Sequence, residues 1–197
     1  MPVQSPPRLI LASTSPYRRA LLERLGLGFE VVAPHVDEAP APGESPHALC
    51  VRLARAKALA VARSVPAAVV IGSDQVAEID GLPVNKPETH AEATRQLRML
   101  RGRTVRFHTA LCILQLDPER SAEERVVTDV VYRLFDDAAI ERYLLRDRPY
   151  DCAGSAKVEG LGIVLTDAVR GDDPTALIGL PLIALTRLLP RFGLSML

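Results

Sequence analysis

An apolar run that leads into a single carboxylate, residues 67–75, constrains the fold of this chain more than any other feature. Its β-branched residues favour a buried strand. Gly72 and Ser73 remove side-chain bulk just before Asp74, so the backbone there can be approached closely. The Ile-Asp-Gly-Leu segment at 79–82 is typical of a two-residue hairpin. We therefore expect Asp74 at the mouth of a core strand, where a carboxylate caps a helix, binds a metal or accepts a proton.

The first strand of the chain leads into a helix whose start suits anions. Residues 9–12 are apolar, Ser15 is a natural N-cap and Pro16 a natural first helical residue. The amides of a helix N-terminus are unpaired and its dipole is positive there, and Arg18 lies in the first turn. The segment predicts a phosphate cradle. The alternative is that Ser13 and Ser15 only cap the helix and Arg18 is solvated.

The remaining pattern predicts an α/β fold: a single domain over residues 1–197, with a mixed twisted sheet flanked by helices. Further strands are expected at 29–32, 104–116, 125–135 and 163–165. Further helices are expected after the caps Ser45 and Thr89, from Asp136 onwards and after Pro181. The two long strands are joined by a short turn around Pro118, so we expect them to be antiparallel.

Charge and cysteine content argue against several classes of protein. The 24 basic residues are balanced by 24 acidic ones, so a broad basic field for nucleic acid is not expected and anion recognition must be local. The three cysteines have neither metal-ligand nor disulfide spacing. Residues 1–7 carry no export signal, and the apolar run 177–185 is shorter than the roughly 20 residues of a membrane span. We expect a soluble, cytoplasmic protein without nucleic-acid or membrane partners.

Several other charged residues, taken one at a time, are typical of a protein surface. Glu38 lies beside another acid in a proline-bracketed loop, which usually leaves both solvated. Lys57 is predicted on a helix, where a lysine is normally a surface charge. Lys86 precedes a proline, which forces extended backbone. Glu159 lies in the glycine-rich loop 152–162, which lets a ligand approach the backbone but lacks a dinucleotide-binding fingerprint.

Six short blocks occur in the order in which they are found in Maf-type proteins. They are Ala-Ser-Thr-Ser-Pro-Tyr-Arg-Arg-Ala-Leu-Leu from residue 12, Asp-Glu at 37–38, Gly-Ser-Asp-Gln at 72–75, Lys-Pro at 86–87, Ala-Gly-Ser at 153–155 and Gly-Leu-Pro at 179–181. The chain resembles this family from about residue 9 to about residue 189. The resemblance implies a nucleoside triphosphate pyrophosphatase that cleaves between the α and β phosphates, with a fold similar to the inosine triphosphatase group.

The resemblance also implies roles for individual residues. Asp74 matches the proton acceptor, Glu38 and Asp74 match the metal site, and family members need Mg²⁺ or Mn²⁺. The phosphate-lining positions are matched by Ser13, Arg18, Lys57 and Lys86. A triphosphate brings roughly four negative charges, which such cations neutralise locally. Mg²⁺ takes one or two carboxylates with water filling the rest, so the match is chemically consistent. Whether Asp74 is base, ligand or both stays open.

Three positions tied to substrate choice in the family are Tyr17, Gln75 and Glu159 here. An aromatic, an amide and a carboxylate resemble the branch that acts on 7-methyl-GTP, although the first position is typically Trp there. Methylation at N7 makes guanine cationic, so Tyr17 gains cation–π attraction and Glu159 can accept the N–H donors of the base. The alternative is that Tyr17 is a partly buried helix residue and Glu159 only pairs with Lys157.

Two other functions stay open. One is a pyrophosphatase for dTTP, UTP or another modified nucleotide, a branch for which we expect Arg, Thr and Gln at the three positions. The other, from a different class, is a non-catalytic nucleotide-sensing regulator of cell division, although this chain keeps every charged position that the chemistry uses. The resemblance further implies a homodimer.

Overall fold

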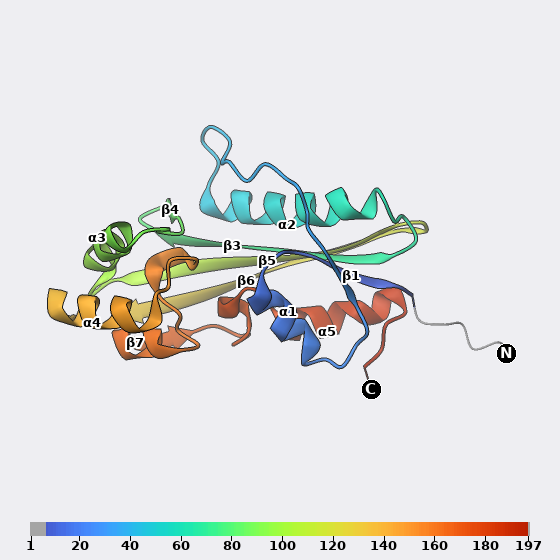
Figure 1. Ribbon diagram of the computed structural model, residues 1–197. Helices are drawn as coiled ribbons and strands as arrows, with labels where there is room; N and C mark the ends of the chain where they lie inside the picture. The colour runs from blue at the N-terminus through green and yellow to red at the C-terminus, as the bar shows by residue number, and fades with distance from the viewer. Residues whose placement is uncertain (1–6, 197) are drawn as a thin grey trace.

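The computed structural model describes residues 7–196, which fold around a mixed seven-stranded sheet (Figure 1). The strands are β1 (Leu9–Ala12), β2 (Glu30–Val32), β3 (Val69–Ile79), β4 (Leu82–Val84), β5 (Thr104–Leu116), β6 (Glu119–Tyr132) and β7 (Thr166–Arg170). They follow the order β2-β1-β3-β5-β6-β7, and β4 pairs with β3. β1 is parallel to β2 and β3, and the other pairs are antiparallel. The prediction that residues 1–7 carry no export signal concerns residues that, apart from Pro7, lie outside the described part of the chain.

Helices cover both faces of the sheet. They are α1 (Pro16–Glu23), α2 (Pro46–Ala62), α3 (His90–Leu100), α4 (Asp137–Asp147) and α5 (Leu182–Leu188), with the 3-10 turns η1 (Ala153–Ser155), η2 (Leu161–Leu165), η3 (Ala176–Ile178) and η4 (Leu189–Phe192). α2 lies along one face, α1 and α5 pack on the other, and α3 and α4 lie at one end (Figure 1). An apolar cluster fills each of these three contacts. In residues 7–196 no helix combines the length and apolar character that crossing a membrane requires.

Capping residues start the helices where the sequence predicts. Side-chain oxygens of Ser15, Ser45, Thr89 and Asp136 accept a first-turn amide of α1, α2, α3 and α4, respectively. Each cap satisfies a donor that the helix leaves unpaired. The predicted hairpin joins β3 to β4 through Asp80 and Gly81, whose φ angles of 53° and 79° suit this turn. The predicted α/β fold, a mixed sheet flanked by helices, is confirmed.

The last strand of the sheet begins later than the sequence predicts. The prediction of a strand at 163–165 is wrong, because these residues lie in the turn η2 and β7 follows it. Ile163 and Val164 are 51% and 48% exposed, so their side chains do not mark a buried strand.

The long hairpin of β5 and β6 is antiparallel, as predicted, but β6 begins earlier. The sequence predicts a strand at 125–135, whereas β6 covers Glu119–Tyr132, ends three residues before the predicted end, and pairs with β5 from Glu119 to Val131. Charged residues fill the first part of β6, so the hydrophobic pattern underestimates a strand that the backbone ladder stabilises.

β3 has an uncovered stretch on one edge, and this stretch positions the site. β5 pairs along most of the opposite edge of β3. On the uncovered edge, β1 pairs up to Gly72 and β4 pairs from Ala77 onwards. Residues 73–76 thus have no strand of the described chain beside them there. The expectation that Asp74 lies at the mouth of its strand is wrong: it lies within β3, at the gap between two neighbouring strands.

Candidate active site

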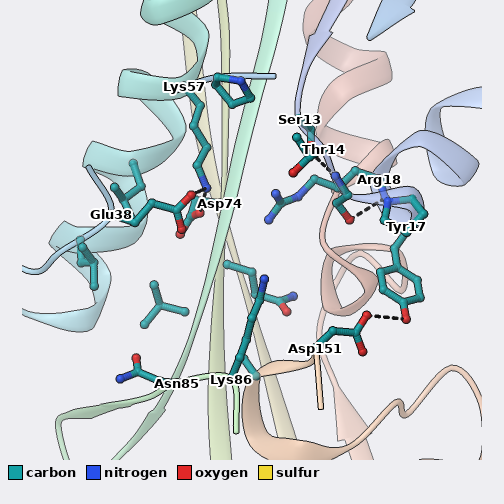
Figure 2. Close-up of a pocket in the computed structure, with 18 of the residues that line it drawn as sticks. Ser13, Thr14, Tyr17, Arg18, Glu38, Lys57, Asp74, Asn85, Lys86 and Asp151 are labelled. Atoms are coloured by element: carbon teal, nitrogen blue, oxygen red, sulfur yellow. Dashed lines mark hydrogen bonds and ion pairs between the residues drawn. The ribbon is translucent and has the colours of Figure 1, made fainter. Parts of the chain in front are cut away.

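The gap beside β3 opens into a cavity of about 740 Å³ (Figure 2). Segments on both sides of the gap contribute to it, since α1 follows β1 and the loop of Lys86 follows β4. The lining includes the residues predicted to act on phosphate, metal and proton, which are Ser13, Arg18, Glu38, Lys57, Asp74 and Lys86. Residues far apart in the sequence therefore meet at one missing stretch of strand pairing.

Lys57 connects the two carboxylates of the cavity. Its ammonium donates to Oδ1 of Asp74 at 2.6 Å and lies 2.8 Å from Oε1 of Glu38 (Figure 2). Lys57 and Asp74 are both only 5% exposed, whereas Glu38 reaches in from an exposed loop. The expectation that Lys57 is a surface charge is wrong, because it lies on the buried face of α2.

Gly72 lets α2 approach β3 closely enough for this pairing. A Cβ atom at Gly72 would lie 2.3 Å from the carbonyl oxygen of Ala54 and 2.6 Å from the amide nitrogen of Ala58. Packed interiors have no room for such overlaps. Lys57 precedes Ala58 in α2, and Asp74 follows Gly72 closely in β3. The close approach predicted at Gly72 is confirmed, and the approaching element is a helix.

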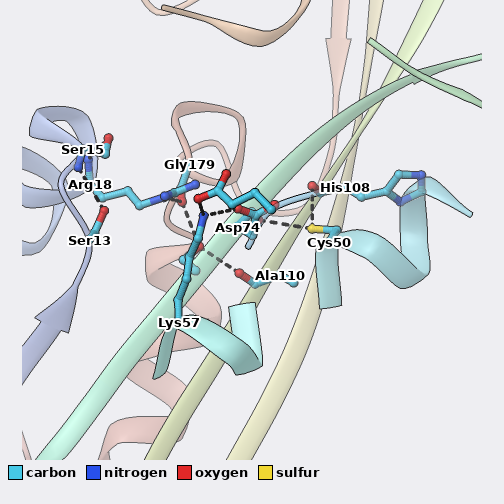
Figure 3. Close-up of polar contacts among 11 residues, drawn as sticks. Ser13, Ser15, Arg18, Cys50, Lys57, Asp74, His108, Ala110 and Gly179 are labelled. Carbon is cyan, nitrogen blue, oxygen red and sulfur yellow. Dashed lines mark hydrogen bonds and ion pairs between the residues drawn. The ribbon is translucent and has the colours of Figure 1, made fainter. Parts of the chain in front are cut away.

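The surroundings of Asp74 favour its protonated form more than water does. Burial raises the pKa of Asp74, while the charges of Lys57 and Arg18 oppose the rise. A carboxylate with a raised pKa is better matched to accepting a proton near neutral pH. The thiol of Cys50 lies 3.2 Å from the carbonyl oxygen of Asp74 and 3.0 Å from that of His108 (Figure 3). Burial raises the pKa of Cys50 to about 12, so this thiol is a donor rather than a nucleophile.

Arg18 is fixed by a loop near the end of the chain. Its Nε donates to the carbonyl oxygen of Gly179 at 2.9 Å (Figure 3). The hydroxyl of Ser73 lies 2.9 Å from the same oxygen. Figure 2 shows the guanidinium pointing toward Asp74. Ser15 caps α1, and its amide donates to Oγ of Ser13 at 3.1 Å. The capping role predicted for Ser15 is confirmed, whereas Ser13 binds the amide of Ser15 and so orders the helix start beside Arg18.

A smaller cavity of about 110 Å³ adjoins the first. Tyr17, Gln75 and Glu159, the positions expected to select the base, all line it. Arg18 and Lys86 line both cavities, so the two lie side by side. The structure thus brings the predicted base-binding and phosphate-binding residues together in adjoining cavities.

Gln75 has a fixed orientation in the smaller cavity. Its Nε2 donates to the carbonyl oxygens of Ala176 at 2.9 Å and Leu177 at 2.8 Å, and lies 3.1 Å from Oγ1 of Thr109. Carbonyl oxygens can only accept, so they must face the amide nitrogen of Gln75. Its Oε1 is then left to accept a hydrogen bond from a ligand.

Asp151, which the sequence analysis did not single out, connects the residues around Tyr17. The Tyr17 hydroxyl donates to Oδ2 of Asp151 at 3.0 Å (Figure 2), while Nζ of Lys157 lies 3.5 Å from Oδ1. The same Nζ lies 5.7 Å from the centroid of the Tyr17 ring. Among the described ion pairs, Lys157 therefore pairs with Asp151, and the alternative pairing with Glu159 is not found. Only its place beside the Ala-Gly-Ser block could have pointed to Asp151.

The carboxylates of the larger cavity suit a hard divalent cation that arrives with its ligand. Among the described residues, no group of three or more His, Cys, Asp or Glu side chains is arranged to hold a metal ion. Glu38 and Asp74 nevertheless converge on one ammonium, so two carboxylates already share a cation position. Mg²⁺ is commonly held by one or two carboxylates, with water and substrate phosphates completing its shell.

An α/β sheet whose strand gap gathers cations and paired carboxylates defines a protein built to bind a compact polyanion. The chain belongs to the family described as Maf-like protein, whose family model matches residues 8–192. Membership confirms the resemblance on which the roles of individual residues were predicted.

Curated relatives are similar along almost their whole length. A protein of Bordetella avium named 7-methyl-GTP pyrophosphatase is 58% identical over 189 residues, which is 96% of this chain and 95% of the relative. Proteins of the same name from Burkholderia pseudomallei and Paraburkholderia xenovorans are 57% and 56% identical, covering 96% and 98% of this chain and 89% and 95% of theirs. Among solved structures, the Staphylococcus aureus Ham1 protein is similar over 64% of this chain and 71% of that chain, with a TM-score of 0.46 and 16% identity.

Proposed function

We propose that this protein is a nucleoside triphosphate pyrophosphatase that converts 7-methyl-GTP to 7-methyl-GMP and pyrophosphate, removing a modified nucleotide from the pool. The observation that carries the proposal is the buried carboxylate of Asp74, paired with Lys57 in a cavity that adjoins a smaller one lined by Tyr17 and Glu159. Full-length relatives with more than half of their residues identical carry the name of this activity.

The cations of the larger cavity bind the triphosphate. Arg18, Lys57 and Lys86 come from three separate segments and reach the phosphates from different sides. The ordered start of α1, with Ser13 beside it, adds backbone donors. A bound Mg²⁺ or Mn²⁺, held by Glu38 and by Asp74, would supply further positive charge to the phosphate oxygens.

Asp74 accepts the proton of the water that attacks the α phosphorus. Lys57 binds Oδ1 of Asp74, which leaves Oδ2 for this water. The water oxygen bonds to the α phosphorus, the bond from that phosphorus to the bridging oxygen breaks, and pyrophosphate leaves with that oxygen. Arg18 and Lys86 hold the phosphates in line for the displacement and offset the charge that develops.

Three residues of the smaller cavity select the base. Tyr17 offers an aromatic face to a ring that methylation has made cationic. Glu159 accepts the N–H donors on the edge of guanine, and Oε1 of Gln75 accepts a further one. Uracil and thymine present one N–H between two carbonyl oxygens, which these acceptors repel.

A substrate panel tests the proposal. Purified protein with Mg²⁺ or Mn²⁺ is given 7-methyl-GTP, GTP, dTTP, UTP and CTP, and pyrophosphate and the matching monophosphate are measured. Preferred turnover of 7-methyl-GTP supports the proposal. Preferred turnover of dTTP or UTP would be consistent with the proposed hydrolysis but would contradict the proposed selection of 7-methylguanine. Binding without turnover in a folded sample would favour the sensing regulator.

We also propose the remaining features that the resemblance and the composition predict. These are a single domain over residues 1–197, a cytoplasmic location and a homodimer. The match of the family model to residues 8–192 supports the domain assignment. Light scattering of the purified protein would test the dimer.

A further inference from the structure

Tyr17 is in contact with a cation that belongs to the protein itself. Nζ of Lys157 lies 5.7 Å from the centroid of the Tyr17 ring, within the range of cation–π attraction. A cationic base stacked on the same ring would therefore lie close to an ammonium. Two like charges that share one aromatic ring repel each other, so Lys157 alone would work against the binding of a methylated guanine.

Asp151 removes this conflict. Its Oδ1 lies 3.5 Å from Nζ of Lys157, and its Oδ2 accepts the hydroxyl proton of Tyr17 at 3.0 Å. The first contact offsets the charge of the ammonium. The second polarises the phenol O–H and raises the electron density of the ring, which makes the ring more attractive to a cation. Burial opposes ionisation of Asp151, but the Tyr17 hydrogen bond and the Lys157 charge outweigh it and lower the pKa, so the carboxylate is charged at neutral pH.

The position of Asp151 fits a role in binding the nucleotide base rather than in stabilising the core. Asp151 lines both cavities, and it is reached from the same side as Tyr17 and Glu159. Its side chain is 57% exposed and that of Lys157 is 21% exposed, so neither partner of this ion pair is fully buried. A stabilising role alone would thus be small, since ion pairs that solvent reaches contribute little.

We propose that Asp151 is a positioning residue that sets the preference for a positively charged base over its neutral counterpart, by orienting Tyr17 and offsetting the charge of Lys157. The inference rests on the proposed function and adds to it a residue outside the three specificity positions. With Asp151 in place, the aromatic ring and its charged neighbours accept a cationic purine. Without it, the same ring carries an uncompensated ammonium.

The test compares two substrates that differ only in the N7 methyl group and its charge. For wild type and Asp151→Asn, kcat/KM is measured with 7-methyl-GTP and with GTP. We expect the ratio of the two values to fall about tenfold in the variant, because an uncompensated charge near the base acts on the cationic substrate alone. The loss should lie mainly in KM, since Asp151 is remote from the reacting phosphate. A purely structural defect would lower kcat/KM equally for both substrates and leave the ratio of the two values unchanged.

Two further variants sharpen the result. Replacing Lys157 as well, in Asp151→Asn/Lys157→Met, should restore most of the ratio, because the uncompensated ammonium is then gone. Asp137→Asn is the matched control. Like Asp151, Asp137 forms ion pairs, in this case with two arginines, but it lies at the start of α4 and lines neither cavity. Its ratio should equal that of wild type.

The outcomes separate this inference from the proposed function. A wild-type protein with no preference for 7-methyl-GTP over GTP contradicts the proposed function, and the inference with it. A wild-type protein with that preference, together with an unchanged ratio in Asp151→Asn, overturns the inference alone. A lowered ratio that Lys157→Met does not restore overturns the charge-offset explanation.

Discussion

The ammonium of Lys57, on α2, lies 2.6 Å from the carboxylate of Asp74, in the middle of β3, and both side chains are buried. The pair joins the helix on one face of the sheet to the open stretch of strand edge. Opposite charges in such a place are tolerated only while both are present, because each compensates part of the desolvation cost of the other. The relationship therefore links the stability of the domain to its chemistry.

Replacing Lys57 with methionine should destabilise the protein strongly. Asp74 would remain buried without its nearest cation, which we expect to cost about 3–5 kcal/mol in urea unfolding at neutral pH. Adding Asp74→Asn should recover most of this loss. Arg55→Met, on the same helix, is the control: Arg55 is 70% exposed and pairs with Glu123 at 3.5 Å, so its loss should cost less than about 1 kcal/mol. Equal costs for the two single variants would contradict the importance of the buried pair.

Asp74→Asn should abolish turnover while the fold persists. Asparagine keeps the size of the side chain and an oxygen for Lys57, but it cannot take a proton from water. We expect kcat to fall by about 10²–10⁴, measured as released pyrophosphate, with the circular dichroism spectrum unchanged. Asp80→Asn in the hairpin turn, where Asp80 is 67% exposed, should turn over as wild type does. Full activity in a folded Asp74→Asn protein would contradict the proposed mechanism.

The same variant should reveal the raised pKa of Asp74 through stability. Burial holds the pKa of Asp74 in the folded state above its ordinary value of 3.8, so ionisation of Asp74 opposes folding. This penalty is absent below that value, grows as pH rises from it to the folded-state pKa, and is constant above. The stability of Asp74→Asn relative to wild type should therefore increase from about pH 4 to pH 8, by about 1.4 kcal/mol for each unit of the shift. Urea unfolding across this range measures it.

Asp137 provides a comparison of opposite sign. A hydrogen bond from Arg98 lowers the pKa of Asp137, so its ionisation favours folding. This contribution is present above the ordinary pKa and is lost as pH falls. Asp137→Asn should thus lose stability relative to wild type as pH rises. Parallel trends in the two variants would contradict the assignment for Asp74.

Gly72→Ala should separate α2 from β3. The added methyl group would meet the backbone of Ala54 and Ala58 at 2.3 and 2.6 Å, so the helix must move. We expect a loss of about 1–3 kcal/mol in unfolding free energy. The displacement of Lys57 should lower kcat/KM by about tenfold or more. Gly28→Ala is the matched control, since nothing lies within 4 Å of a Cβ there, and it should change neither quantity. An unaffected Gly72→Ala protein would show that the helix position is not critical.

Local signals predicted the helix starts and the hairpin, because caps such as Ser15 and turn residues such as Gly81 act through the backbone next to them. The burial of Lys57 could not be predicted in this way. It depends on the glycine of another element and on the gap left between β1 and β4, both of which are properties of the assembled sheet. Asp151 could not be predicted as a site residue for the same reason, since its partners Tyr17 and Lys157 come together only in the fold.

Glu159→Gln should weaken discrimination between guanine and uracil. Glu159 and Gln75 line one small cavity, and the amide nitrogen of Gln75 is held by the carbonyl oxygens of Ala176 and Leu177, so both residues offer acceptors to the base. A second amide is free to turn its nitrogen toward the base, where it opposes the N–H donors of guanine but suits a carbonyl oxygen of uracil. We expect the kcat/KM ratio of 7-methyl-GTP to UTP to fall by about 10-fold or more. Glu119→Gln, at the exposed start of β6, is the control for a lost surface charge. An unchanged ratio in Glu159→Gln would mean that the base is bound elsewhere, whatever the rate of hydrolysis.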